Sequence, residues 1–260
     1  MNIDVLISCM QQTDWSIAER SGLNSGAVIV NQCDRDAVEE TIVNGHSVRM
    51  YSTTDRGLSR SRNMAIENSR ADICLISDDD EIYADEYVEK LQQAFTSCPK
   101  ADIILFQVAN DIGKTFSPIP FRVGYLCALK FASWQIAFRR ESIMKAGIRF
   151  DVEMGSGTGH GSNEETKFLY DCLRKGLWLQ YVPVEIARLI PGSESQWFKG
   201  FDAKYFLNRG WSTARYMGKF FGALYVTYFA IRKFPLYRKD CSMFRAWTNM
   251  LKGIFCNPYQ

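Results

Sequence analysis

The stretch Ile73-Cys74-Leu75-Ile76-Ser77-Asp78-Asp79-Asp80-Glu81 places a short apolar run directly before four acidic side chains. Like charges this close disfavour joint ionisation, so the cluster favours a neutralising partner. A divalent cation that takes oxygen ligands, Mg²⁺ or Mn²⁺, is the usual one. The apolar run is typical of a strand, and the carboxyl ends of strands in open α/β sheets face the crevice where ligands bind. The alternative is a solvated acidic turn before a helix that starts near Tyr83.

Strand-like and helix-like segments alternate through the first half of the chain. The predicted strands are 3–8, 27–31, 48–51, 73–77 and 103–106, and the predicted helices are 36–43, 59–68 and 84–95. Short apolar runs separated by helical patterns indicate βαβ units. We therefore predict an α/β fold whose central sheet is mostly parallel and flanked by helices.

The second half continues the alternation and then changes character. The pattern predicts a loop at 114–123, a strand at 132–138, a helix at 140–146, a glycine- and serine-rich loop at 151–163, a helix at 163–175 and a last strand at 178–182. Beyond residue 196 the chain has a helical and aromatic pattern. We therefore expect a catalytic domain at 1–198 and a helical appendage at 199–260.

Composition and charge narrow the class of protein. The 260 residues are 47% hydrophobic and 23% charged, which suffices for one large α/β domain with an appendage. The net charge is only +2, but residues 199–260 contain eleven Lys or Arg and two Asp, a net of +9. The remainder is therefore acidic, and the basic tail suggests an anionic partner.

Three features favour a cytosolic protein. The eight cysteines form no CxxC pair and several lie in apolar runs, which is typical of reduced, buried thiols. The start of the chain has no charged segment followed by an apolar one, so no signal peptide is expected. The apolar run 220–231 has about 12 residues, whereas a membrane-spanning helix needs roughly 20.

Polar side chains follow the second predicted strand. Asn31, Gln32 and Asp34 offer donors and acceptors that could bind the edge of a nucleobase. Asp34 or Asp36 could instead cap the helix that we expect to follow. Both interpretations stay open.

The segment Arg56-Gly57-Leu58-Ser59-Arg60-Ser61-Arg62-Asn63 is a second candidate site. A glycine turn opens a helix whose first turn carries Ser59 and arginines, and helix N-termini and arginine both bind phosphate well. A capped helix with solvated arginines is the alternative. That alternative explains one arginine easily, but not three around Gly57 and just upstream of an acidic cluster.

Glu164 and Glu165 follow the glycine-rich loop at a helix start. The helix dipole alone favours carboxylates there. The functional alternative is a general base mounted behind a loop that could close over substrate. His160, one of two histidines, could ligate a metal or contact a phosphate, or it could be an ordinary loop residue, which is the interpretation we favour.

In this order around the acidic cluster, these segments resemble the inverting family 2 glycosyltransferases, which have the GT-A nucleotide-sugar fold. The similarity covers residues 2–185 and lies in the first strand, the segment 57–63, Ser77-Asp78-Asp79-Asp80, and Asn163-Glu164-Glu165-Thr166-Lys167-Phe168-Leu169. The resemblance implies that the aspartates are the DxD motif of a UDP-hexose-dependent enzyme. The acceptor would be a capsule or lipopolysaccharide-type glycan on a lipid carrier.

The resemblance also implies roles for single residues. Asp80 would bind Mn²⁺ or Mg²⁺, Asp78 would lie near the ribose and the metal, Asp79 would adjoin the donor, and Arg62 would lie near the nucleotide. The family usually has Glu-Asp at the pair, and its second residue is the base, hence Glu165 with Glu164 in reserve. The mechanism implied is a single displacement with inversion at the anomeric carbon.

The basic and aromatic tail suits an anionic membrane surface, which predicts a cytoplasmic enzyme peripheral to the inner face of the cell membrane. A helical cap with solvated charges is the alternative, and no motif supports nucleic-acid binding. Two other functions remain. A sugar nucleotidyltransferase would need a glycine-rich loop after the first strand, where this chain has Ser8-Cys9-Met10-Gln11-Gln12. The other is an inactive nucleotide-sugar-binding or scaffold protein, which the intact acidic motifs disfavour.

Overall fold

The computed structural model describes residues 1–107, 116–160, 162–190, 200–256 and 259. The strands are β1 (Ile3–Met10), β2 (Gly26–Gln32), β3 (Ala37–Val43), β4 (His46–Thr53), β5 (Ile73–Ser77), β6 (Glu81–Tyr83), β7 (Ile103–Gln107), β8 (Phe121–Arg122), β9 (Ile136–Arg139), β10 (Leu179–Glu185) and β11 (Ala187–Leu189). The helices are α1 (Ser16–Arg20), α2 (Leu58–Asn68), α3 (Tyr87–Ser97), α4 (Tyr125–Ala128), the 3₁₀ turn η2 (Ser133–Gln135), α5 (Arg140–Ala146), α6 (Glu164–Arg174), α7 (Ala203–Met217), α8 (Lys219–Arg232), α9 (Phe234–Tyr237) and α10 (Met243–Phe255).

Nine strands form one mixed sheet in the order β3-β4-β2-β1-β5-β9-β7-β10-β8. Strands β4, β2, β1 and β5 run parallel, as do β7 and β10. Strand β9 is antiparallel to both of its neighbours and joins the two parallel groups. The prediction of an α/β fold with a mostly parallel central sheet is confirmed, and β6 and β11 add a separate antiparallel pair.

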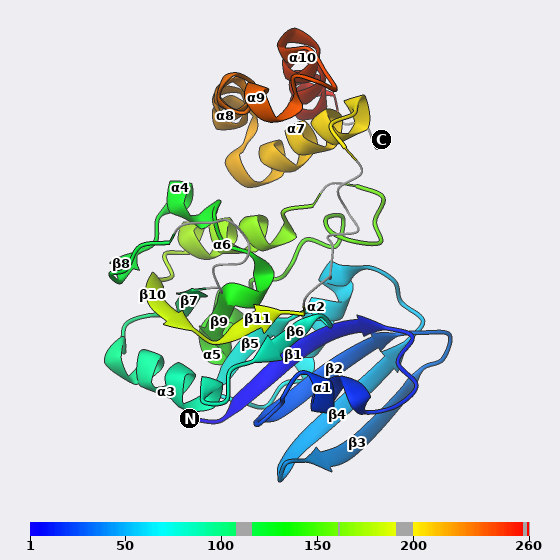
Figure 1. Cartoon of the computed structure of the whole chain (residues 1–260), viewed down its shortest axis with the longest axis vertical. Coiled ribbons are helices and arrows are strands. Elements are labelled where there is room, and N and C mark those ends of the chain that lie inside the picture. Colours follow the sequence, from blue (N-terminus) through cyan, green and yellow to red (C-terminus); the bar gives the residue numbers. More distant parts are fainter. Residues whose placement is uncertain (108–115, 161, 191–199, 257–258, 260) are drawn as a thin grey trace.

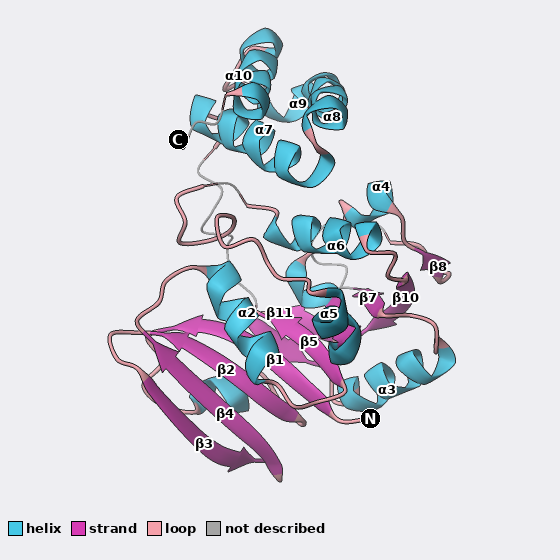
Figure 2. Ribbon diagram, turned by 180° about the vertical axis from the view of Figure 1, so that it is seen from behind, coloured by secondary structure: helices cyan, strands magenta, loops and turns pink. Residues whose placement is uncertain are grey.

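Helices cover both faces of the sheet (Figures 1 and 2). Alternate residues of the central strands point to opposite faces, so Val5 packs with α1 and α3 while Leu6 packs with α2, α5 and α6. Residues Ile73–Ile76 of β5 are all fully or almost fully buried, as expected for a strand covered on both sides. This burial brings the acidic residues that follow Ser77 to the edge of the sheet.

The predicted helix at 36–43 is wrong, because these residues form β3, an antiparallel edge strand beside β4. Residues 37–43 alternate between partly buried and exposed side chains along most of the strand, which is the period of a strand. Asn44 and Gly45 both have positive φ, 49° and 81°, and close a tight hairpin turn. The Asn-Gly pair is the sequence signal that identifies this hairpin.

Several other boundaries differ from the prediction. Helix α3 begins at Tyr87 rather than at residue 84, and the strand expected over 132–138 is restricted to β9 because Ser133–Gln135 form the turn η2. Strand β10 is followed by β11, so 178–182 is not the last strand. The expected loop at 114–123 contains the two residues of β8, and its first two residues lie outside the described part of the chain.

Helices α7, α8 and α10 pack together above α6, with their own apolar cluster around Phe206, Tyr237 and Met250 (Figure 1). Two glycines let α7 and α10 touch. A Cβ atom on Gly210 would lie 1.9 Å from the carbonyl oxygen of Met250, and one on Gly253 would lie 2.1 Å from that of Leu207. The tail is therefore helical, as predicted. The predicted domain boundary at 198/199 lies outside the described residues.

Among the described residues, no helix is both long enough and apolar enough to span a membrane. The eight cysteines are free thiols, and Cys9, Cys33, Cys74 and Cys172 are buried.

Candidate active site

The acidic cluster divides into an internal and an external part. Glu81 is 1% exposed and points back into the protein, where it accepts hydrogen bonds from Ser77 Oγ at 2.9 Å and from the Asp78 amide at 3.0 Å. Burial, and then the nearby Asp78 carboxylate, raise the pKa of Glu81 well above its ordinary value. Glu81 therefore shapes the turn, and the three aspartates are left at the edge of the sheet.

Asp78 is held by two donors from distant parts of the chain. Its Oδ1 accepts a 2.8 Å hydrogen bond from Arg62, and its Oδ2 accepts one of 3.1 Å from the Ser133 hydroxyl in η2. The Asp80 carbonyl accepts a 2.8 Å hydrogen bond from the Ile190 amide, which fixes the turn against the end of β11. The orientation of the aspartates is thus set by the surrounding fold.

Arg62 lies at the centre of the site. It is 1% exposed, and its guanidinium donates to Asp78 through one nitrogen and to Glu164 Oε1, at 2.9 Å, through another. Burial opposes the charge of Arg62, but the carboxylates of Asp78 and Glu164 outweigh that effect and raise its pKa above the ordinary value. Arg62 therefore joins the acidic turn to the glutamate pair. It is buried rather than solvated, and its predicted place near the nucleotide stays a prediction.

The glutamate pair separates into two environments at the start of α6. Glu164 is 6% exposed and bound to Arg62, whereas Glu165 has no hydrogen bond to Arg62 and keeps partial exposure. Burial and then the Glu164 charge raise the pKa of Glu165 to about 8, against the opposing effect of Arg62. A carboxylate with a pKa near neutrality has the proton affinity that a general base requires.

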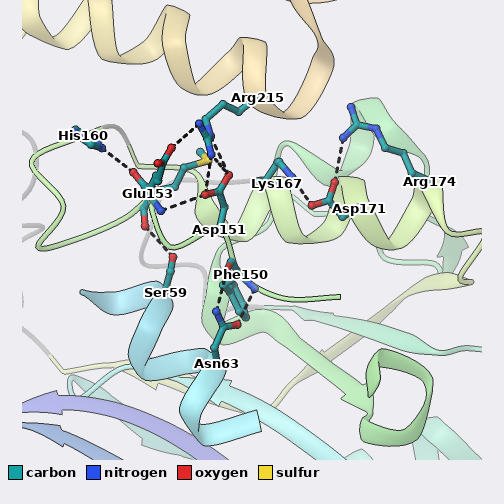
Figure 3. Close-up of polar contacts among 11 residues, drawn as sticks. Ser59, Asn63, Phe150, Asp151, Glu153, His160, Lys167, Asp171, Arg174 and Arg215 are labelled. Atoms are coloured by element: carbon teal, nitrogen blue, oxygen red, sulfur yellow. Dashed lines mark hydrogen bonds and ion pairs between the residues drawn. The ribbon is translucent and has the colours of Figure 1, made fainter. Parts of the chain in front are cut away.

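The glycine-rich loop covers the beginning of α2 (Figure 3). The Ser156 carbonyl accepts the Leu58 amide at 2.9 Å, and the Ser59 hydroxyl donates to the Met154 carbonyl at 2.8 Å. The loop also approaches Gly57 closely, because a Cβ on Gly157 would lie 3.2 Å from the Gly57 Cα atom. Gly57 and Ser59 therefore contact the loop that leads to the glutamate pair, and their predicted contact with a nucleotide stays a prediction.

The predicted base-binding residues lie at the exit of β2. The Asn31 amide group is fully buried and exchanges two hydrogen bonds with the Gln12 backbone, of 2.9 and 2.8 Å. Gln32 Oε1 accepts the Gly57 amide at 2.7 Å, and the exposed Asp34 pairs with Arg56 at 2.8 Å. Asn31 and Gln32 are thus bound to backbone groups of neighbouring segments, and Asp34 stays exposed. Their predicted contact with a nucleobase stays a prediction.

His160 lies in the glycine-rich loop and contacts the tail. Its Nδ1 is 3.0 Å from the Glu153 carbonyl oxygen, and its ring packs against Trp211 and Tyr259 of the tail, at centroid distances of 5.3 and 4.0 Å. These contacts give His160 a place between the loop and the tail. They fit the favoured interpretation of an ordinary loop residue, and the alternative role as a metal ligand stays a prediction.

The acidic turn is the candidate site for the divalent cation that the sequence predicts. In the described parts of the chain, no three or more His, Cys, Asp or Glu side chains gather into a metal-binding group. Mg²⁺ is commonly held by one or two carboxylates together with substrate phosphates. Asp78 and Asp80, with Asp79 between them, provide such an oxygen-donor set, so the residues fit a diphosphate-bound cation.

The contacts of three positioning residues were not predicted from the sequence, and of these residues only Asn63 belongs to a candidate segment. Ser133 was included in a strand, although its hydroxyl binds Asp78. Asn63 exchanges two hydrogen bonds with the Phe150 backbone, of 2.9 and 2.8 Å. Arg215 of α7 binds both carboxylate oxygens of Asp151, at 2.8 and 2.9 Å, and also pairs with Glu153 (Figure 3). No local sequence signal marks these contacts, because each joins segments far apart in the chain.

The fold and this arrangement of acidic side chains define a glycosyltransferase of the GT-A class. The model of the family "Glycosyl transferase family 2" matches residues 8–155, more than half of the chain. The protein belongs to glycosyl transferase family 2, and the predicted family and class of enzyme are confirmed. No curated protein matches the chain.

Solved structures of S. aureus TarS share the fold. A crystal structure of TarS residues 1–349 has 12% sequence identity and a TM-score of 0.59, and the match covers 98% of this chain and 81% of that one. A crystal structure of the same TarS fragment in complex with UDP-GlcNAc has 14% identity and a TM-score of 0.62, covering 98% and 82%. A third structure contains UDP, with 14% identity, a TM-score of 0.57 and coverage of 92% and 74%.

Proposed function

We propose that this glycosyltransferase moves a hexose from a nucleoside-diphosphate sugar, a UDP-sugar in the first instance, to a glycan acceptor with inversion at the anomeric carbon. The observation that carries the proposal is the bridge from Asp78 through Arg62 to Glu164. This bridge brings a donor-binding acidic turn next to a candidate base, Glu165. The TarS structures with UDP-GlcNAc and UDP support the choice of donor through their common fold.

Asp78 and Asp80 would hold Mn²⁺ or Mg²⁺ together with the donor diphosphate, and Asp79 would adjoin them. When bound, the cation supplies Lewis-acid neutralisation of the charge that develops on the leaving nucleoside diphosphate. Arg62 and Ser133 each donate a hydrogen bond to one carboxylate oxygen of Asp78. These two donors fix Asp78 before substrate arrives, which favours catalysis because no reorganisation is needed.

Glu165 would take the proton from the acceptor hydroxyl. The acceptor oxygen then forms its bond to the anomeric carbon while the bond from that carbon to the diphosphate oxygen breaks, and the electron pair leaves with the nucleoside diphosphate. Glu164 is already committed to Arg62, so it serves to position the start of α6 rather than to accept the proton. The proposal therefore assigns Glu165 as the base, in a direct displacement without a covalent enzyme intermediate.

The acceptor in this proposal is a lipid-linked glycan of surface-polysaccharide biosynthesis, of the capsule or lipopolysaccharide kind. Residues 199–260 carry a net charge of +9, which is complementary to an anionic lipid surface. The enzyme would then work from the cytoplasm at the inner face of the membrane. A lipid-linked acceptor and a basic tail are mutually consistent, because both bring the reaction to the bilayer.

Calorimetric titration of UDP, GDP and CDP into the purified protein, with Mn²⁺ and then with EDTA, tests the donor. Binding of UDP that requires Mn²⁺ would support the proposal, and absence of binding by every nucleotide in a folded sample would refute it. Glu165→Gln separates an enzyme from an inactive binding protein. That variant should keep UDP affinity and lose transfer, whereas an unchanged transfer rate would exclude Glu165 as the base.

A further inference from the structure

Helix α8 has two apolar faces, of which only one is covered. Gly222, Val226, Phe229 and Ala230 are buried against the other tail helices. At 100° per residue, a second set of side chains lies on the opposite side of the helix. This set, the exposed α8 face, comprises Phe220 (71% exposed), Phe221 (66%), Leu224 (57%), Tyr228 (59%) and Ile231 (63%).

Such a face is unusual on the surface of a folded protein. A helix that is apolar on all sides is normally buried, and contiguous exposed apolar patches mark interaction sites. Single exposed hydrophobic residues need no explanation, but here five large ones follow a single helix. Leu236 in the adjoining α9 is also 63% exposed. The exposed α8 face therefore needs a partner that is itself apolar at the contact.

The charges around this face indicate which partner it is. Lys219 lies at one end of α8, and Arg232 and Lys233 lie at the other, all exposed. Between residues 203 and 239 the sequence contains no Asp or Glu. A second copy of the chain would bring like charges together around its apolar contact. An anionic bilayer offers both an apolar interior and opposite charge at its surface.

We propose that the exposed α8 face inserts into the interfacial region of an anionic membrane, with α8 lying parallel to the bilayer plane and its basic ends at the headgroups. The proposal rests on the proposed association of residues 199–260 with a membrane and identifies the contact. In this proposal the tail binds the membrane both through its positive charges and through the apolar side chains of the exposed α8 face. Salt should then weaken binding without abolishing it, because salt screens charges but does not reduce apolar insertion.

The position of α8 links this contact to the site. Helix α7 ends at Met217 and α8 begins at Lys219, so Arg215 lies five residues from Phe220. Arg215 holds Asp151 and Glu153 at the base of the glycine-rich loop. A protein docked through α8 would therefore hold its candidate active site in a fixed relation to the bilayer. This orientation would keep the candidate active site close to a lipid-linked acceptor in the same bilayer.

Sedimentation with vesicles tests the proposal. The full-length protein is mixed with phosphatidylcholine vesicles or with vesicles that also contain phosphatidylglycerol, at low and high salt. The triple variant Phe220→Ser, Leu224→Ser, Ile231→Ser removes the apolar contact and keeps every charge. We expect the wild type to bind the anionic vesicles and to retain part of this binding at high salt. The triple variant should partition at least about tenfold more weakly.

A matched control is Val38→Ser with Ile42→Ser, on the edge strand β3, where both side chains are similarly exposed at 66% and 65%. This control should bind vesicles as the wild type does. Equal binding by the triple variant and the wild type would overturn the proposal. So would a wild-type dimer in light scattering that the triple variant converts to a monomer, because the face would then hold a second copy.

Two further measurements keep this result apart from the proposed function. Circular dichroism and thermal melting should be unchanged in the triple variant, because the replaced side chains are exposed. UDP titration should give the same affinity in the triple variant and the wild type. If the wild type bound vesicles but no nucleotide, the transferase proposal would fail and the membrane contact would stand.

Discussion

The guanidinium of Arg62 donates a 2.9 Å hydrogen bond to Glu164 and ties α2 to α6 across 102 positions of the chain. The same group holds Asp78 at 2.8 Å, so one buried cation fixes both acidic motifs of the site. A buried charge is costly unless it is paired, and here each partner is paired by the other. Arg62 is therefore the member of this group whose removal would leave two carboxylates without their counter-charge.

Replacing Arg62 by Ala should destabilise the protein by about 3–5 kcal/mol, because Glu164 and Asp78 would lose their buried counter-charge. Chemical denaturation measures this loss. Arg62→Ala combined with Glu164→Gln should recover part of it, since one unpaired carboxylate is removed. Arg60→Ala is the matched control, as Arg60 is exposed on the same helix and should change stability by less than about 0.5 kcal/mol.

The acidic limb of the kcat/KM profile should report the ionisation of Glu165, whose pKa is raised to about 8. Activity should rise with pH up to that value, because the base must be deprotonated. The charged and titratable groups near Glu165 are Glu164, Arg62, Asp78 and, from α7, Tyr216. Glu164→Gln removes a like charge and frees Arg62 from its partner, so it should move the limb to lower pH. A shift to higher pH would contradict this description of the site.

Glu165→Gln should also alter the dependence of stability on pH. Since the pKa of Glu165 is higher in the folded protein than its ordinary value of 4.5, the folded state retains the proton more tightly. The contribution of this protonation to the free energy of unfolding is fully present below pH 4.5 and is lost as the pH rises through about 8. We expect the variant to gain on the order of 1 kcal/mol over the wild type above pH 8, a modest figure because Glu165 is partly exposed. Urea titrations at pH 5 and pH 9 make the comparison.

Asp80→Ala should abolish Mn²⁺-dependent UDP binding, because Asp80 is the principal candidate ligand and lies in the turn fixed by Ile190. Calorimetry with and without EDTA provides the measurement. Glu141→Ala removes a carboxylate whose side chain is 77% exposed on α5, and it should leave binding unchanged. Retained metal-dependent binding in Asp80→Ala would remove this residue from the metal site.

Gly210→Ala should disrupt the tail, because the added methyl group would lie 1.9 Å from the Met250 carbonyl oxygen. Two backbones would have to separate, with an expected cost of about 3 kcal/mol or more. Gly222→Ala is the matched control, since its Cβ would meet Thr213 at an ordinary 3.5 Å. Limited proteolysis of residues 200–256 should accelerate in the first variant and not in the second.

Much of the fold could be predicted from the sequence, and so could the acidic character of the candidate site. The apolar run before the aspartates predicted β5 with its observed bounds, and the pattern at 163–175 predicted α6 to within one residue at each end. These segments succeed because their periodicity or burial is strong and local. The segment 36–43 failed because a short stretch of mixed polar and β-branched residues fits a helix or a strand. Pairing with β4 through the Asn44-Gly45 turn selected the strand.

By itself, the sequence determined the α/β fold and predicted which carboxylates and glycines the candidate site contains. Only the tertiary structure decided which of these side chains are buried, which are paired and which remain partly exposed. It placed Arg62 between Asp78 and Glu164, turned Glu81 inward, and left Glu165 partly exposed with a pKa raised to about 8. The physical reason is that hydrogen bonds and burial shift ionisation through space, and the partners that create them here come from segments that no local pattern connects.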